Sequence, residues 1–113
     1  AAVANLSIWR DEPVQARIVG LAAMQASELT AIASHPKVES TRQCGTIAAF
    51  DLAADTSGYL SNWAVHLNAF GKAHGVLIRP LGNTVYVMPP YCITAEQLSH
   101  VYAVVRDGLE RKT

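Results

Sequence analysis

The 113-residue chain has little charge, and neither sign is in excess. It contains nine lysines and arginines and nine aspartates and glutamates, so its formal net charge is zero and charged residues make up only 16%. Proteins that bind nucleic acid through its phosphates need an excess of cationic side chains, usually in clusters. No run of lysine or arginine occurs here. The sequence therefore predicts a protein without a nucleic-acid partner.

Long apolar runs are also missing, although half of the residues are hydrophobic. Charged residues interrupt the apolar runs well before the roughly 20 residues that a membrane-spanning helix needs, so we expect no membrane partner. No signal peptide is predicted, since the opening AAVANLSIWRDEP lacks a basic start and a cleavage pattern. Because this alanine-rich opening lacks an initiating methionine and has a helical composition, we expect it to end a longer helix of a larger protein.

Cysteine and catalytic motifs are scarce as well. Cys44 and Cys92 belong to no CxxC or Cys/His spacing, which indicates reduced thiols in a cytoplasmic protein. His66 and His74 lie eight residues apart, turned by about 80° on a helix, and no further ligand completes a metal site. No GxSxG, GxGxxG or P-loop motif occurs. We expect no metal ligand, no cofactor ligand and no catalytic residue in this chain.

What the sequence does have is amphipathic periodicity, in a length that suits one domain with a single core. A long helix is predicted to run to about Ser34, with Asp11 as its N-cap and His35-Pro36 ending it. Its apolar residues recur at helical spacing from Val14 to Ile32, and Gln25 interrupts the apolar side. A second amphipathic helix is predicted for residues 59–74. A third should begin at Thr94, which has capping-box spacing to Gln97. Its predicted buried stripe consists of Leu98, Val101, Tyr102, Val105 and Leu109.

Short apolar segments between these helices favour strands. Residues 45–52 have the composition of a central strand. Residues 76–79 and 84–88 are expected to form a β-hairpin around Pro80-Leu81-Gly82-Asn83, ended by Pro89-Pro90. The predicted fold is α+β, a small and mostly antiparallel sheet of about three strands with helices packed on it, in a single domain of residues 1–113.

Two side chains of the expected hairpin are candidates for binding. An arginine before a proline at a strand end is usually a surface charge, and a tyrosine in a strand usually fills a cross-strand position. Arg79 nevertheless offers a planar fork that matches the two oxygens of a carboxylate, which lysine does not. Tyr86, on the opposite arm, could add a hydroxyl near the same place.

The same stretch resembles a known family. Residues 75–91 match every fixed position of the pattern G-V-x-x-R-P-x-G-x-x-x-Y-x-M-P-P-Y, which is found in the adenosylmethionine-8-amino-7-oxononanoate aminotransferases of the biotin pathway. This family belongs to the class-III aminotransferases. More loosely, AAVANLSIWRDEP is similar to the helix that leads into the family's small domain, and RQCGTIAAFDL to the strand after it.

The resemblance implies the C-terminal small domain of a homodimeric enzyme that uses pyridoxal 5'-phosphate (PLP) to move an amino group from S-adenosylmethionine to 8-amino-7-oxononanoate. Residues 1–10 would then end the helix between the two domains. By matching position, Arg79 binds the carboxylate of this small-molecule substrate and Tyr86 lines the same pocket. Neither residue would take part in the proton transfers.

In the family, the groups that hold PLP belong to a large domain, and the lysines of this chain match none of them. The chain is therefore expected to bind no PLP and to be inactive without that domain as its partner. Two alternatives stay open, of which one is the small domain of another class-III aminotransferase that acts on a different ω-amino or oxo acid. The other is a stand-alone α+β module that binds an acidic ligand through Arg79. The lysines of this chain, which match none of the family's PLP-holding groups, are Lys37, Lys72 and Lys112.

Overall fold

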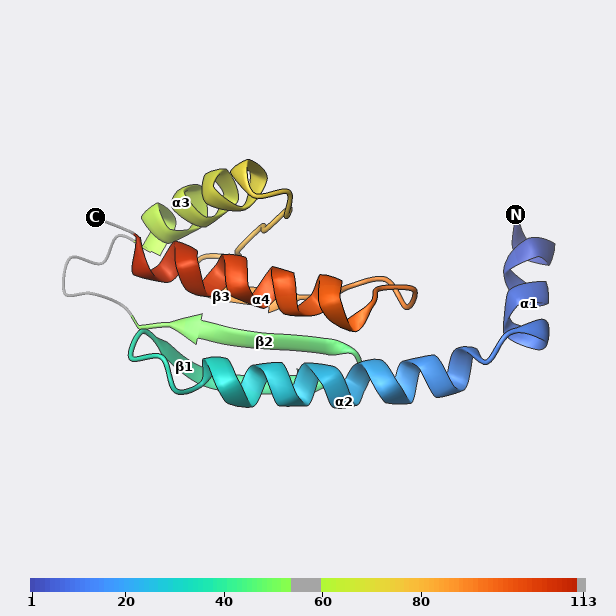
Figure 1. The fold of residues 1–113 in the computed structure, drawn as a ribbon. Helices are drawn as coiled ribbons and strands as arrows, with labels where there is room; N and C mark the ends of the chain where they lie inside the picture. The colour runs from blue at the N-terminus through green and yellow to red at the C-terminus, as the bar shows by residue number, and fades with distance from the viewer. Residues whose placement is uncertain (54–59, 112–113) are drawn as a thin grey trace.

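The computed structural model describes residues 1–53 and 60–111. The fold is α+β, as predicted from the sequence, and its elements are shown in Figure 1. Parts of two predictions, the start of a helix at Tyr59 and the placement of Lys112, lie outside the described residues. The elements are α1 (Ala2–Asp11), α2 (Val14–Ile32), β1 (Val38–Cys44), β2 (Ile47–Leu52), α3 (Leu60–Ala73), β3 (Thr84–Val87) and α4 (Ala95–Glu110).

The strands form one antiparallel sheet in the order β1-β2-β3. β2 lies in the middle, which confirms the prediction of a central strand at residues 45–52. Successive side chains of a strand point to opposite faces, and on β2 Phe50 and Leu52 are fully buried. The other face of the sheet, which we call the open face, carries the residues that alternate with the buried ones. These residues are Ile47, Ala49, Asp51, Thr84 and Tyr86.

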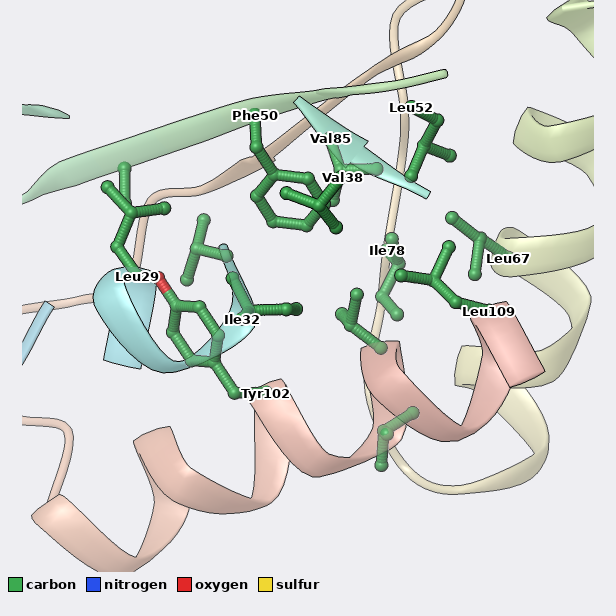
Figure 2. Close-up of a cluster of buried hydrophobic side chains, with 14 of the residues drawn as sticks. Leu29, Ile32, Val38, Phe50, Leu52, Leu67, Ile78, Val85, Tyr102 and Leu109 are labelled. Atoms are coloured by element: carbon green, nitrogen blue, oxygen red, sulfur yellow. The ribbon is translucent and has the colours of Figure 1, made fainter. Parts of the chain in front are cut away.

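The core lies between the sheet and the helices. In Figure 2, Phe50 and Val85 of the sheet point toward Ile32 of α2 and Tyr102 of α4. Burying a side chain such as Phe50 contributes about 1.5–3 kcal/mol to folding. α3 packs beside α4, as Figure 1 shows, and continues the core through Leu67. No helix in the described ranges is long and apolar enough to cross a lipid bilayer.

Helix α1 lies apart from this core. None of its residues is buried, and Figure 1 shows it projecting at one end of the molecule. The Trp9 ring makes an edge-to-face contact with Tyr91, with 6.4 Å between the ring centres. The projection explains the radius of gyration of 15.5 Å, since a compact domain of this length has a value near 13 Å.

The start of α4 confirms the prediction of a capping box. The Thr94 hydroxyl accepts a hydrogen bond from the Gln97 backbone N–H at 3.1 Å, and the Gln97 side chain accepts one from the Thr94 N–H at 2.9 Å. The predicted stripe is also confirmed, because its members are buried except for Val101, which is partly buried.

The predicted N-cap at Asp11 is wrong. Asp11 is the last residue of α1, where its carboxylate pairs with Arg10 at 2.8 Å. α2 begins at Val14 without a side-chain cap, after Pro13. The proline separates the two helices because it has no N–H to donate and its ring restricts φ. The helix expected at residues 1–10 therefore continues through Asp11 and ends at this break.

The predicted hairpin of residues 76–79 with 84–88 is wrong as well. Residues 76–79 form no strand, and the one bridge lies at the predicted turn, where Leu81 and Thr84 exchange backbone hydrogen bonds of 2.9 Å. Residues 75–79 are irregular because backbone groups within them bond to α3 instead of β3. β3 pairs with β2, and the hairpin that forms joins β1 to β2.

Strand β1 was not predicted. Its sequence VESTRQC has a single buried residue, Val38, and therefore no apolar alternation that would mark it as a strand. A bulge interrupts its pairing with β2 between Glu39 and Arg42, where Ser40 has a φ of 54°. Hydrogen bonding to β2, which the local sequence does not encode, is what extends this segment.

Gln25 does not interrupt the apolar side of α2 but is fully buried there. Its amide nitrogen donates to the carbonyls of Thr46 at 2.9 Å and Val87 at 3.1 Å, and its oxygen accepts from the Tyr102 hydroxyl at 2.5 Å. Burial, with a smaller contribution from Glu28, raises the pKa of Tyr102, so the hydroxyl keeps the proton that it donates. One buried amide thus joins α2, the β1–β2 turn, β3 and α4.

Candidate functional site

Arg79 lies in the irregular segment between α3 and β3, and it is exposed. Its guanidinium forms no hydrogen bond or ion pair with any other residue that the structure describes. The neighbouring Ile78 points into the core with 5% exposure. Arg79 therefore stands on the surface with its charge available to a ligand or to another part of a protein.

Tyr86 lies on β3, and it is half-buried on the open face of the sheet. Its neighbours Val85 and Val87 point to the core. Across the sheet it pairs with Ala49 of β2, whose small side chain leaves room beside the tyrosine ring. Tyr86 is therefore a residue of the sheet surface and not part of the hydrophobic core.

Tyr86 also lines a groove of about 720 Å³. The walls are residues 75–78, residues 85–90, Cys92, Ile93 and α4 as far as Val105, and most of the lining is apolar. The sequence did not indicate the α4 wall, which contributes Glu96, Gln97 and His100 as polar groups. Arg79 is not among the lining residues, although its neighbour Ile78 is. Of the two candidate residues, the structure therefore brings only Tyr86 to the groove.

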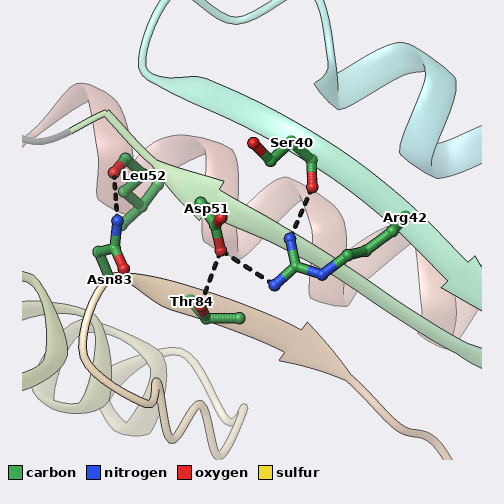
Figure 3. Close-up of polar contacts among 6 residues, drawn as sticks. All are labelled: Ser40, Arg42, Asp51, Leu52, Asn83 and Thr84. Carbon is green, nitrogen blue, oxygen red and sulfur yellow. Dashed lines mark hydrogen bonds and ion pairs between the residues drawn. The ribbon is translucent and has the colours of Figure 1, made fainter.

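The open face also carries a cluster of polar side chains, drawn in Figure 3, which the sequence did not predict. Arg42 donates to the Asp51 carboxylate at 3.0 Å and to the Ser40 carbonyl at 2.7 Å. The Thr84 hydroxyl donates to the same carboxylate at 2.7 Å. The two bonds to the carboxylate, that from Thr84 first and that from Arg42 second, lower the pKa of Asp51. Unlike Arg79, Arg42 is therefore already occupied by partners within the chain.

The lowered pKa of Asp51 predicts a loss of stability in acid. A carboxyl group whose pKa is lower in the folded state stabilises the fold above its unfolded pKa of about 4, and this contribution disappears as the pH falls through the folded value. Asp51→Asn should therefore lose less unfolding free energy between pH 7 and pH 3 than the unchanged chain does. Urea titrations at both pH values measure this difference. Equal losses in the two proteins would contradict the role assigned to Asp51.

The described residues do not fit a site for PLP. The ammonium group of Lys37 donates to the Leu109 carbonyl at 2.8 Å and lies over the Trp63 ring. Lys72 is exposed on α3, and neither of the two described lysines lines the groove. The part of the chain that is described also contains no cluster of three or more side chains suited to a metal ion. No step of cofactor chemistry is therefore assigned to these residues.

The family of the chain follows from comparison with known proteins. The family model described as "Aminotransferase class-III" matches residues 1–109. The chain belongs to the class-III aminotransferase family.

Two curated relatives match nearly the whole of this chain but only part of their own length. The adenosylmethionine-8-amino-7-oxononanoate aminotransferase of Synechococcus elongatus is 40% identical over 110 residues, which are 97% of this chain and 26% of that protein. An uncharacterized aminotransferase of Bacillus subtilis is 30% identical over 119 residues, covering 96% of this chain and 26% of the relative. The chain thus spans about a quarter of the length of these curated relatives.

Solved structures agree on the fold. A structure titled "Transaminase with L-ala" superposes with a TM-score of 0.85 over 96% of this chain and 27% of its own, at 24% identity. The omega transaminase of Pseudomonas jessenii in complex with PMP gives a TM-score of 0.79 over 94% of this chain and 24% of its own, again at 24% identity. At this level of identity the likeness shows the fold of the chain.

Proposed function

We propose that this chain is the C-terminal small domain of a longer aminotransferase that moves an amino group from S-adenosylmethionine to 8-amino-7-oxononanoate, giving 7,8-diaminononanoate for biotin synthesis. The observation that carries the proposal is the 40% identity to the Synechococcus enzyme of that name over nearly the whole chain. The match of residues 75–91 to the pattern of that family supports the same substrate.

In this function Arg79 binds the carboxylate of 8-amino-7-oxononanoate and Tyr86 lines the pocket. The guanidinium of Arg79 is exposed and pairs with none of the described residues, which supports its part, since it would give up no bond to them on binding. The position of Tyr86 in an apolar groove suits the aliphatic part of such an acid. The charged contact is worth about 1.5–3 kcal/mol and the hydroxyl about 1 kcal/mol, which together give no better than roughly millimolar affinity. The remaining affinity has to come from other parts of the enzyme.

The cofactor and the partners are proposed on the same basis. PLP, which supplies the electron-withdrawing ring in amino-group transfer, is held by the large domain of the longer protein, because the residues described here do not fit it. The partners are that domain and a second copy of the enzyme, in the cytoplasm. Nucleic acid and membranes take no part.

A second candidate is an aminotransferase of the same class that acts on a different oxo acid. The relative in Bacillus subtilis is the reason to test it, because it matches almost the whole chain and its name gives an aminotransferase without a substrate. Arg79 would then bind the acid group of another substrate. The two candidates differ in the acceptor and in the donor, so a substrate assay separates them.

The full-length enzyme is expected to convert 8-amino-7-oxononanoate to 7,8-diaminononanoate with S-adenosylmethionine as the amino donor and to show a PLP absorbance band. The 113-residue chain alone should do neither, because the groups that would hold PLP lie outside its described residues. Product formation by mass spectrometry and the visible spectrum measure both. Turnover with other ω-amino acids but not with S-adenosylmethionine would favour the second candidate. A stoichiometric PLP band in the isolated chain would contradict the domain assignment.

A further inference from the structure

The segment that carries Arg79 runs beside the sheet without belonging to it. Hydrogen bonding to the arm that contains β3 ends at the bridge between Leu81 and Thr84. Residues 75–79 have no strand pairing, so the ladder of the sheet does not determine where the backbone of Arg79 lies. Another part of the fold has to hold it.

Helix α3 supplies that hold. The side-chain amide of Asn68 donates to the Ile78 carbonyl at 2.9 Å, and the Val76 N–H donates to the Gly71 carbonyl at 2.8 Å. The contact is close, because a Cβ built on Gly71 would lie 2.5 Å from the Val76 carbonyl oxygen. Of these two bonds, the one from Asn68 reaches nearer to Arg79, since the Ile78 carbonyl belongs to the peptide group that joins Ile78 to Arg79.

We propose that Asn68 is a positioning residue for Arg79. Its hydrogen bond sets the plane of the 78–79 peptide, with Ile78 directed into the core and Arg79 outward. Binding of a carboxylate by two parallel hydrogen bonds requires the guanidinium plane in one orientation. Rotation of that peptide would carry the guanidinium away from its ligand. This inference rests on the proposed function, and it concerns a residue that would touch neither substrate nor cofactor.

Asn83 offers a matched control. It is also a partly buried asparagine, and its amide donates to a backbone carbonyl, that of Leu52, at 3.1 Å. That bond holds the end of β2 and does not involve the peptide next to Arg79. Replacing either asparagine by alanine removes one side-chain hydrogen bond, and alanine at position 68 suits a helix interior.

The test uses the full-length enzyme. Asn68→Ala should raise KM for 8-amino-7-oxononanoate about tenfold, since small misplacements of a binding group are costly, while kcat and the half-reaction with S-adenosylmethionine stay unchanged. Asn83→Ala should leave KM and kcat unchanged. The two variants should lower the melting temperature by similar amounts, since each loses one side-chain hydrogen bond. Asn68→Asp, which keeps the size but cannot donate, should behave like Asn68→Ala. An unchanged KM in Asn68→Ala, or an equal change in Asn83→Ala, would overturn the inference.

Failure of the proposed function would look different, because the wild-type enzyme itself would not turn over this acid. In that case hydrogen exchange of the backbone amides of residues 77–79 and of Leu81 decides whether Asn68 holds the segment. Faster exchange there in Asn68→Ala, but not in Asn83→Ala, supports the positioning role. Equal exchange in both variants refutes it. With an active enzyme, Asn68→Ala should add no further rise in KM when Arg79 is already alanine, since the positioned group is then missing.

Discussion

Arg79→Ala in the full-length enzyme is expected to raise KM for 8-amino-7-oxononanoate by about 10- to 150-fold. This range corresponds to the loss of about 1.5–3 kcal/mol for a hydrogen bond to a charged group. The half-reaction with S-adenosylmethionine and the PLP absorbance should change little, because Arg79 binds one substrate and does not hold the cofactor. Folding should be unaffected, since the side chain is exposed and makes no bond with a described residue. Steady-state kinetics with each substrate varied in turn measure the effect.

A second arginine provides the control. Arg42 lies on β1, and its guanidinium is bound to Asp51 and to the Ser40 carbonyl. Arg42→Ala should therefore leave KM for the oxo acid unchanged. Arg79→Lys keeps the charge but loses the planar fork, and should lie between alanine and the wild type. If both half-reactions fell equally in Arg79→Ala, the role assigned to this residue would be wrong.

Gln25→Leu is expected to lower the free energy of unfolding by about 3 kcal/mol, because it leaves buried polar groups without a partner. Leucine fills a similar volume but offers neither a donor nor an acceptor. The carbonyls of Thr46 and Val87 would lose a donor and the Tyr102 hydroxyl its acceptor. Urea unfolding of the 113-residue chain, monitored by circular dichroism, measures the change.

A double-mutant cycle with Tyr102→Phe tests the explanation. Phenylalanine removes the hydroxyl that Gln25→Leu would leave unpaired in the core. The double variant should therefore lose less unfolding free energy than the two single variants lose in sum. The losses are not additive because the two side chains share one buried hydrogen bond. Strict additivity would show that the 2.5 Å bond between these side chains does not contribute to stability.

The candidate site could be predicted only in part. Arg79 and Tyr86 were found because their types and spacing match a family pattern, and their binding roles remain predictions. Asn68 carried no comparable signal, since its bond to Ile78 crosses from a helix to a segment that was expected to be a strand. The α4 wall of the groove was missed for a similar reason, because residues distant in sequence meet there through packing.

The features that depend on residues close together in the sequence could be predicted from the sequence alone. The helical periodicity, the capping box at Thr94 and the central strand around Phe50 depend on residues within a few positions of one another, so the sequence by itself determined them. The partners of the edge strands and of Gln25 were decided only in the tertiary structure. β1 has no apolar alternation, so its pairing with β2 is what makes it a strand. The segment before Arg79 lies outside the sheet because its backbone bonds to the preceding helix α3 and not to β3, although its composition favours a hairpin.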